Sequence, residues 1–272
     1  MHHTLNTMRI DVYLNEAGLA RSRTEAKSMI SDGLVYVDGK LIDKPSYPVD
    51  GNENLVRVES YEKRYASRGG KKLVAALDMF GIDPSGKLCL DIGASSGGFT
   101  DCLLQRGASH VVALDSGKDQ LVDYLREDSR VTVLEGFNAR YLSSKDLEYI
   151  PDLVVMDVSF ISATYIIEAV YSVISLDGDF ICLIKPQFEV GREGIGKGGI
   201  VKDVRAHTEA AEKVIIFAAS VGFECVGLIP SPITGGDGNR EFLAKYILRG
   251  TPCVPPDTDE IKKITARKQK GA

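Results

Sequence analysis

Seven short apolar segments recur between residues 87 and 248, and most are separated by segments whose apolar residues have helical spacing. Apolar strands that alternate with helices form a mostly parallel sheet covered on both faces. The sequence therefore predicts an α/β domain. The predicted strands are 87–92, 110–115, 131–135, 153–158, 179–185, 224–230 and 242–248, and the predicted helices are 71–80, 98–106, 118–127, 161–175 and 204–221.

A smaller α+β module precedes this domain. One helix is predicted to run from Arg9 and stop at Gly18, and a second begins at the capping box of Ser22 and Glu25. The segment "LVYVDGKLI" predicts a hairpin with an Asp-Gly turn. Composition changes near residue 60. We expect a small domain at 1–60, a linker at 61–70, an α/β domain at 71–252 and a basic tail at 253–272.

The charge is concentrated in patches. The net charge of −5 argues against a nucleic-acid partner, but residues 61–72 carry five cations and one anion, and the last twelve carry five cations. Such patches can hold phosphate even when the total charge is negative. For the tail, a solvated and frayed surface segment is the preferred interpretation.

Other function classes are disfavoured by what the sequence lacks. No stretch approaches the ~18 apolar residues of a membrane span, and the N-terminus has no apolar signal core. The five cysteines are widely spaced, without a C-x-x-C motif or a His/Cys cluster, so no metal site is predicted. A cytoplasmic protein with reduced cysteines is expected.

The stretch DIGASSGGFTD, Asp91 to Asp101, joins the first predicted strand to a helix. A dinucleotide site needs G-x-G-x-x-G, and Ser95 replaces its second glycine. S-adenosylmethionine fits better, with Asp91 receiving its ammonium group and Asp115 its ribose hydroxyls. Asn138, after the third strand, could contact the adenine. Asp115 could instead be a simple turn acid. The predicted cofactor residues are Asp91, Gly93, Ala94, Ser95, Gly97, Gly98, Phe99, Asp115 and Asn138.

Charged residues also follow the later strands. Asp157 and Lys185 end the fourth and fifth strands, and Glu241 precedes the last. A buried cation is costly, so we expect a neutral Lys185 that accepts a proton from a sugar hydroxyl, with Asp157 aligning it. A second lysine after the linker, Lys71 or Lys72, would lie nearby as a second cation. Unrelated surface ion pairs are the alternative.

The motifs "SRGGKKL", "DIGASSGGFTD", "VVALD", "NAR", "MDVSFIS", "LIKPQFEVG" and "GNREF" together closely resemble the TlyA family, which is similar in its catalytic domain to FtsJ-type ribose methyltransferases. The resemblance implies a Rossmann-like class I fold and S-adenosylmethionine as cofactor. It also implies a K-D-K-E tetrad, which falls on Lys72, Asp157, Lys185 and Glu241.

The front module is similar to a small RNA-binding domain shared by a ribosomal protein, pseudouridine synthases and tyrosyl-tRNA synthetases. The family implies 2′-O-methylation of cytidine in ribosomal RNA, with ribosomal RNA or subunits as partners. Tyr65 stands where relatives can carry tryptophan, which leaves domain coupling through the linker open. The predicted RNA contacts are Arg9, Arg21, Arg23, Lys27, Arg64 and Arg68.

Three other functions are weighed against this one: a membrane-damaging hemolysin, a catalytically inactive RNA-binding protein, and a dinucleotide oxidoreductase. The lack of a span or signal disfavours the first, the intact tetrad the second and Ser95 the third. The glycine-rich segment 190–203 carries Arg192, Lys197 and Lys202. It could close over RNA phosphates or be a flexible excursion without a ligand.

Overall fold

The computed structural model of the 272-residue chain describes residues 7–20, 22–31, 33–50, 55–58, 65–235 and 238–267. The chain divides into two compact units, residues 1–64 and 65–272. The N-terminal α+β unit contains β1 (Met8–Arg9), α1 (Ile10–Glu16), α2 (Arg23–Ser31), β2 (Val35–Val37), β3 (Lys40–Leu41), β4 (Pro48–Val49) and β5 (Val56–Val58).

The small unit has its own apolar core, in which Ile10 and Leu14 of α1 pack with Met29 and Ile30 of α2 against the strands. Its described strands form a β3-β2-β5 sheet and a β1-β4 pair. Asp38 (φ 51°) and Gly39 (φ 79°) both have positive φ between β2 and β3. That is the geometry of a type I′ turn, so the predicted Asp-Gly hairpin is confirmed.

In the large unit the described residues form a seven-stranded sheet with the order β11-β12-β10-β9-β6-β7-β8. Five neighbouring strands are parallel, whereas β12 runs antiparallel to both β10 and β11. The predicted mostly parallel sheet is confirmed. Its strands are β6 (Leu88–Ile92), β7 (His110–Asp115), β8 (Val131–Glu135), β9 (Leu153–Met156), β10 (Asp179–Ile184), β11 (Phe223–Pro230) and β12 (Phe242–Leu248).

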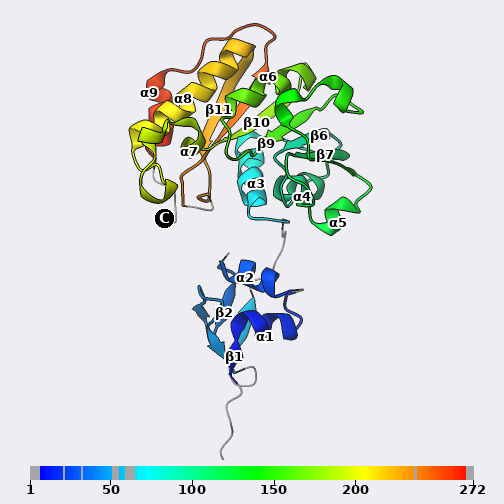
Figure 1. The fold of residues 1–272 in the computed structure, drawn as a ribbon, viewed down its shortest axis with the longest axis vertical. Coiled ribbons are helices and arrows are strands. Elements are labelled where there is room, and N and C mark those ends of the chain that lie inside the picture. The colour runs from blue at the N-terminus through cyan, green and yellow to red at the C-terminus, as the bar shows by residue number, and fades with distance from the viewer. Residues whose placement is uncertain are drawn as a thin grey trace, which may run out of the picture. The chain divides into compact units, whose positions relative to one another are not determined.

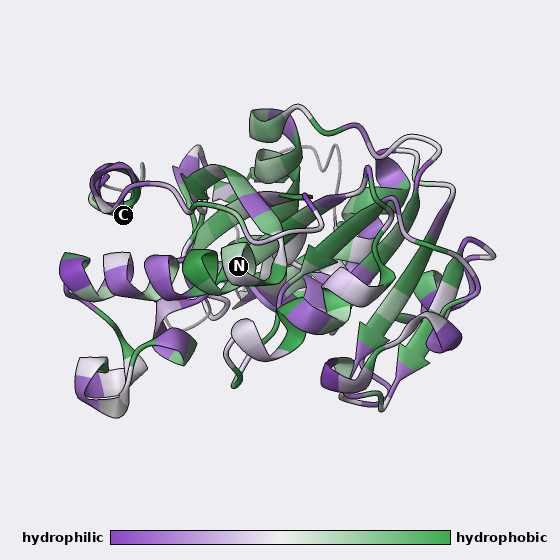
Figure 2. Ribbon diagram, turned by 90° about the horizontal axis from the view of Figure 1, so that it is seen from above, coloured by the Kyte–Doolittle hydropathy of each residue, from purple (hydrophilic) through white to green (hydrophobic). Residues whose placement is uncertain are grey.

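Helices cover both faces of this sheet (Figure 1). One apolar cluster joins the sheet to α3, α4 and α5, and another joins it to α6, α8 and α9. The strands between these layers are mainly hydrophobic, as Figure 2 shows. The helices are α3 (Gly69–Phe80), α4 (Gly98–Gln105), α5 (Asp123–Arg126), α6 (Thr164–Val173), α7 (Pro186–Glu189), α8 (Val204–Val221) and α9 (Thr258–Thr265).

The topology brings several loops to one edge of the sheet. The order of the strands along the chain reverses between β6 and β9, which opens a crevice at the carboxyl ends of the parallel strands. Asp157 and Lys185 directly follow β9 and β10 at that edge. Ile184 pairs with Phe242 in the antiparallel β10–β12 register, so Glu241 reaches the same edge from the opposite chain direction.

The structure differs from two sequence predictions. The helix predicted at 118–127 is reduced to Asp123–Arg126. The segment predicted as a basic tail contains α9, in which Ile261 is 2% exposed and Thr265 Oγ1 lies 2.8 Å from Thr208 Oγ1 of α8. This helix packs through one apolar face, so the tail is not frayed up to residue 267.

Candidate active site

The glycine-rich turn between β6 and α4 is shaped by neighbours within the protein. A Cβ on Gly93 (φ +85°) would lie 2.4 Å from the carbonyl oxygen of Asp157. A Cβ on Gly97 (φ +97°) would lie 2.3 Å from Leu125 Cδ1, and one on Gly98 would lie 2.2 Å from Ser67 Oγ. The glycines therefore allow close approach of neighbouring groups that belong to this chain.

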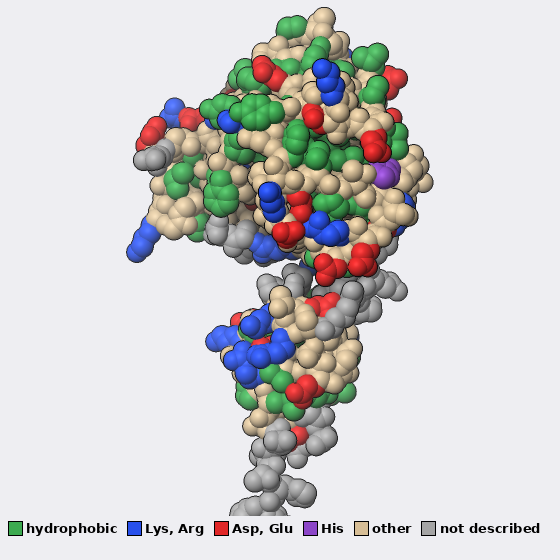
Figure 3. Space-filling model, turned by 45° about the vertical axis from the view of Figure 1, so that its right-hand side comes forward, with side chains coloured by type: hydrophobic (Ala, Val, Ile, Leu, Met, Phe, Trp, Pro, Cys, Tyr) green, Lys and Arg blue, Asp and Glu red, His purple; other side chains and the backbone are tan. Residues whose placement is uncertain are grey.

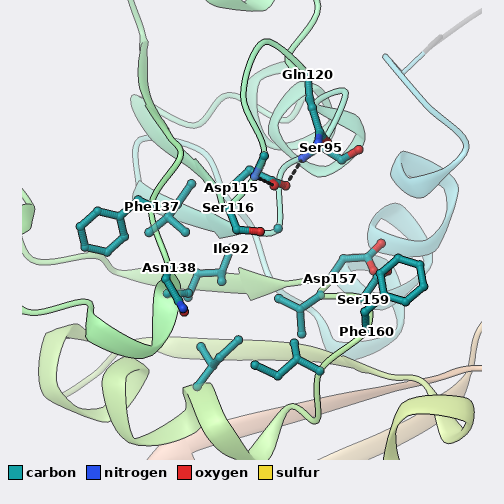
Figure 4. A pocket seen from close by; sticks show the side chains of 17 residues that line it. Ile92, Ser95, Asp115, Ser116, Gln120, Phe137, Asn138, Asp157, Ser159 and Phe160 are labelled. Atoms are coloured by element: carbon teal, nitrogen blue, oxygen red, sulfur yellow. Dashed lines mark hydrogen bonds between the residues drawn. The ribbon is translucent and has the colours of Figure 1, made fainter.

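Beside this turn lies a cavity of about 530 Å³, which we call the large cavity. Asp115 is fixed in its wall, because Ser95 N–H donates to Oδ2 at 2.8 Å and Gly117 N–H donates to Oδ1 at 2.7 Å (Figure 4). Each carboxylate oxygen keeps a further acceptor site for a ligand hydroxyl. Other residues of the wall are Ile92, Gly93, Leu114, Ser116, Gln120, Phe137, Asn138, Val158, Phe160 and Ile166.

Asn138 and Glu135 shape the same region. Asn138 lines the large cavity, and its Oδ1 accepts the N–H of Arg140 at 3.1 Å. Burial alone would raise the pKa of Glu135, but backbone N–H groups of residues 119–121 and the Arg126 guanidinium lower that pKa to about 2. Glu135 thus anchors the loop that carries Gln120, which sequence reasoning missed.

A second cavity of about 280 Å³, the small cavity, adjoins the first. Both cavities are lined by Gly93, Ser95, Asp157 and Ser159. The small cavity brings together three of the four predicted catalytic residues, Lys72, Asp157 and Lys185. It is also lined by Arg68, Ala94, Gly98 and Phe99 from the predicted contact residues.

Asp91, which the sequence predicts to receive the ammonium group of the cofactor directly or through water, is buried. The side chain is 0% exposed, and Asp91 is not among the described residues that line the large or the small cavity. Thr100 Oγ1 donates to Asp91 Oδ2 at 2.6 Å, while Oδ1 has no hydrogen-bond partner in the described part of the chain. Burial raises the pKa of Asp91 to about 7. Asp91 therefore stabilises the turn through its hydrogen bond with Thr100. Gly97 is also buried, and it packs against Leu125.

The predicted tetrad forms two ion pairs. Lys72 Nζ lies 2.5 Å from Glu241 Oε2, and Lys185 Nζ lies 2.6 Å from Asp157 Oδ1. Lys72 and Glu241 are 6% and 2% exposed; burial raises the pKa of Glu241, and the charge of Lys72 partly offsets this. Lys72 lines the small cavity together with Lys185, and each of the two lysines has a carboxylate as its charged partner.

Ser159 is a site residue that the sequence analysis did not select. Lys185 Nζ donates to Ser159 Oγ at 2.8 Å, so the amine is held between Ser159 and Asp157. Figure 4 shows Asp157, Ser159 and Phe160 grouped on one wall, away from Asp115. The position of the serine, two residues after a strand-ending acid in "MDVSF", was the available signal.

In the N-terminal unit, basic side chains gather on one face (Figure 3). Arg9 Nε pairs with Asp11 Oδ1 at 2.8 Å, and Arg23 Nη2 lies 3.3 Å from Asp11 Oδ2. These arginines, above all through hydrogen bonds from Arg9, lower the pKa of the buried Asp11. Both arginines remain about half exposed, and Lys27 is exposed. The predicted contacts Arg21 and Arg64 lie outside the described residues.

Membrane-spanning helices and metal clusters are both absent from the described part of the chain. None of its helices combines the length and the hydropathy needed to cross a membrane. No group of three or more His, Cys, Asp or Glu side chains among the described residues could hold a metal ion.

Comparison with protein families matches residues 65–246 to the FtsJ-like methyltransferase model. The chain belongs to the FtsJ-like methyltransferase family. Residues 8–55 match the S4 domain model. The two lysine–carboxylate pairs therefore lie within the segment that matches the FtsJ-like methyltransferase model, and an S4 domain precedes that segment.

Several relatives are similar over most of their length. The 16S/23S rRNA (cytidine-2′-O)-methyltransferase TlyA of Mycobacterium tuberculosis is 44% identical over 86% of this chain and 88% of its own. Hemolysin A of Brachyspira hyodysenteriae is 40% identical over 89% of this chain and 100% of its own. The solved structure of a presumed hemolysin from Streptococcus thermophilus is 40% identical, with a TM-score of 0.75, and covers 97% of this chain and 96% of its own.

Proposed function

We propose that this FtsJ-like methyltransferase uses S-adenosylmethionine to methylate ribose 2′-hydroxyls of ribosomal RNA, with cytidine as the target nucleoside. The observation that carries the proposal is the shared wall of the two cavities. The large cavity, which contains the carboxylate of Asp115, opens beside the small cavity, in which Lys185 lies between Asp157 and Ser159. A methyl donor and a nucleophile can therefore meet at the residues common to both.

The large cavity suits the cofactor in size, since ligand pockets commonly have volumes of ~300–1,000 Å³. Asp115 would accept the ribose hydroxyls, Phe137 and Asn138 would contact the adenine, and the turn at Gly93 and Ser95 would hold the methionine end. When bound, S-adenosylmethionine supplies an electrophilic methyl group on a sulfonium centre.

The small cavity suits the attacking hydroxyl. Lys185, when neutral, would take the proton of the ribose 2′-hydroxyl as that oxygen attacks, and Asp157 and Ser159 would orient its amine. Lys72 would donate a hydrogen bond to the same hydroxyl, and Glu241 would hold Lys72 in place. Arg68 at the rim would pair with a phosphate of the RNA backbone.

Two observations support ribosomal RNA as the substrate. The relative from Mycobacterium tuberculosis is named for methylation of 16S and 23S rRNA, and the S4 domain presents exposed Arg9, Arg23 and Lys27. Cations that pair with phosphates position a protein on RNA without reading its sequence. We therefore infer that ribosomal subunits or their RNA are the partners and that the enzyme acts in the cytoplasm.

The test is transfer of label from S-adenosylmethionine to purified ribosomal subunits by the wild type, Lys185→Met and Lys245→Met. Lys245 is a matched control, because it pairs with Asp179 at 3.0 Å at the opposite edge of the sheet. Loss of a general base typically lowers the rate ~10²–10⁴-fold, so Lys185→Met should lose transfer and Lys245→Met should keep it.

The labelled linkage identifies the reaction. A 2′-O-methyl group makes the neighbouring phosphodiester resistant to alkali, so labelled dinucleotides should survive alkaline hydrolysis of the RNA. Label in alkali-sensitive mononucleotides, or transfer unaffected by Lys185→Met, would contradict the proposal. Lysis of erythrocytes by both the purified wild type and Lys185→Met would instead favour the function in the name of the Brachyspira relative.

A further inference from the structure

The two partners of the Lys185 amine, Asp157 and Ser159, belong to one loop, residues 157–163, between β9 and α6. At its start, Asp157 N–H donates to the carbonyl of Ile92 at 2.9 Å. Farther along, Phe160 has a φ of 63° and is 91% exposed. A loop with a strained, exposed residue needs an anchor at its other end to keep one geometry.

That anchor is Glu189, which ends helix α7 four residues after Lys185. Its Oε2 accepts the hydroxyl of Ser162 at 2.6 Å, and its Oε1 accepts the N–H of Ala163 at 2.8 Å. Glu189 is 6% exposed. One buried carboxylate therefore joins the segment that carries Lys185 to the loop that carries both the ion-pair partner and the hydrogen-bond acceptor of its amine.

The charge of this carboxylate is balanced locally. Lys213 of α8 lies 3.1 Å from Glu189 Oε2 and donates to the Glu189 carbonyl at 2.9 Å. The carboxylate also faces the first turn of α6, where an anion is favoured by the helix dipole. Such an arrangement would stabilise the fold even without any role in catalysis, so the test must separate the two effects.

We propose that Glu189 is a positioning residue for methyl transfer, which holds Asp157 and Ser159 in register with Lys185. The inference rests on the proposed role of Lys185 as general base. Glu189 is not among the described residues that line the two cavities. Its loss should therefore lower kcat and leave the KM values for S-adenosylmethionine and RNA unchanged.

The variants are Glu189→Ala, Glu189→Gln and a control, Asp257→Ala. Asp257 caps α9 by accepting the N–H of Asp259 at 2.7 Å, so the control removes a helix cap without touching the loop. A misplacement of about 1 Å can cost ~10²-fold in rate, and we expect a loss of that order in Glu189→Ala. Glu189→Gln keeps an acceptor for Ala163 and should recover most of the rate.

A second measurement needs no RNA. Trace acetylation of lysines, quantified by peptide mass spectrometry, reports how freely the Lys185 amine reacts. Release from Asp157 and Ser159 should speed labelling of Lys185 in Glu189→Ala but not in Asp257→Ala. If the wild type failed to methylate ribosomal RNA but this labelling difference were seen, the proposed substrate would be wrong and the role of Glu189 would stand.

The inference is overturned if folded Glu189→Ala keeps the wild-type kcat and Lys185 labelling rate. It is also overturned if kcat falls by the same factor in Asp257→Ala, because the effect would then follow from general destabilisation. If Glu189→Ala does not fold, Ser162→Ala removes the 2.6 Å bond to Glu189 and the contacts of the Ser162 hydroxyl with Thr164, but it keeps the bond from Ala163 N–H to Glu189. It should give a smaller loss of kcat in the same direction.

Discussion

Replacing Gly93 by alanine should damage both the fold and the site, and Gly81 provides the matched control. Both glycines have left-handed backbone, with φ of +85° at Gly93 and +64° at Gly81. An added Cβ at Gly81 meets nothing within 4 Å. At Gly93 it would lie 2.4 Å from the Asp157 oxygen and 2.9 Å from the Asp157 carbonyl carbon. The two variants therefore share a conformational cost but differ in steric overlap.

The magnitudes follow from these two terms. Left-handed backbone costs a residue with a Cβ about 1–2 kcal/mol, partly offset by ~0.4–1 kcal/mol because alanine restricts the unfolded chain. Gly81→Ala should thus lower the free energy of unfolding by about 1 kcal/mol. Overlap with neighbouring backbone adds ~1–3 kcal/mol, so Gly93→Ala should lose about 2–4 kcal/mol.

The assay is thermal unfolding of both variants, followed by methyl transfer at a temperature where both are folded. For a unit of this size, 1 kcal/mol corresponds to ~2–4 °C in Tm. Gly93→Ala should also slow transfer, since relief of the overlap displaces Asp157 from Lys185, whereas Gly81→Ala should be fully active. Equal Tm losses in the two variants, or normal transfer by Gly93→Ala, would refute this reasoning.

Three further outcomes are expected. In the apo protein, the pKa of Asp91 rises on folding from 3.8 to about 7. The folded state therefore binds this proton more tightly than the unfolded state, and the free energy of unfolding falls as pH rises through that range. Asp91→Asn should flatten this part of a profile of stability against pH. Lys72→Met should lower the free energy of unfolding by ~3–5 kcal/mol because it leaves the buried carboxylate of Glu241 unpaired. Chemical denaturation should show that the double variant Lys72→Met/Glu241→Leu recovers this stability, while methyl transfer stays lost. The pKa of Glu135 falls on folding from 4.5 to about 2, so the stabilisation by Glu135 is complete above pH 4.5 and is lost as pH falls toward 2. Denaturation measured across this pH range should show that Glu135→Gln is less stable than the wild type at pH 7 and equally stable near pH 2.

Much of the sheet could be predicted because buried strands are short apolar runs with polar ends. The segments 110–115, 131–135 and 242–248 were predicted with the bounds that the structure shows. The helix predicted at 118–127 was too long for a physical reason. The N–H groups of residues 119–121 donate to the Glu135 carboxylate, and no local pattern reveals that competing acceptor.

The site residues, like the helices and strands, could be predicted from the sequence only in part. Asp157 and Lys185 could be placed together because parallel strands end at one edge, and the resemblance selected Lys72 over Lys71. The sequence did not show that Asp91 is buried outside the walls of the two cavities. Alternation along a strand assigns side chains to its two faces, but it does not indicate which face meets a ligand when helices cover both. Glu189 was missed because its partners, Ser162 and Ala163, lie on a different loop.

The antiparallel strand β12 has a consequence for biosynthesis. Lys72 and Glu241 are 169 positions apart in the chain, and β12 is inserted between β10 and β11. The ribosome must therefore synthesise almost the whole α/β unit before Lys72 can pair with Glu241. A nascent chain that ended before residue 241 would already contain the glycine turn and Lys185. It would hold Lys72 without its carboxylate, so such a fragment should remain inert until synthesis is nearly complete.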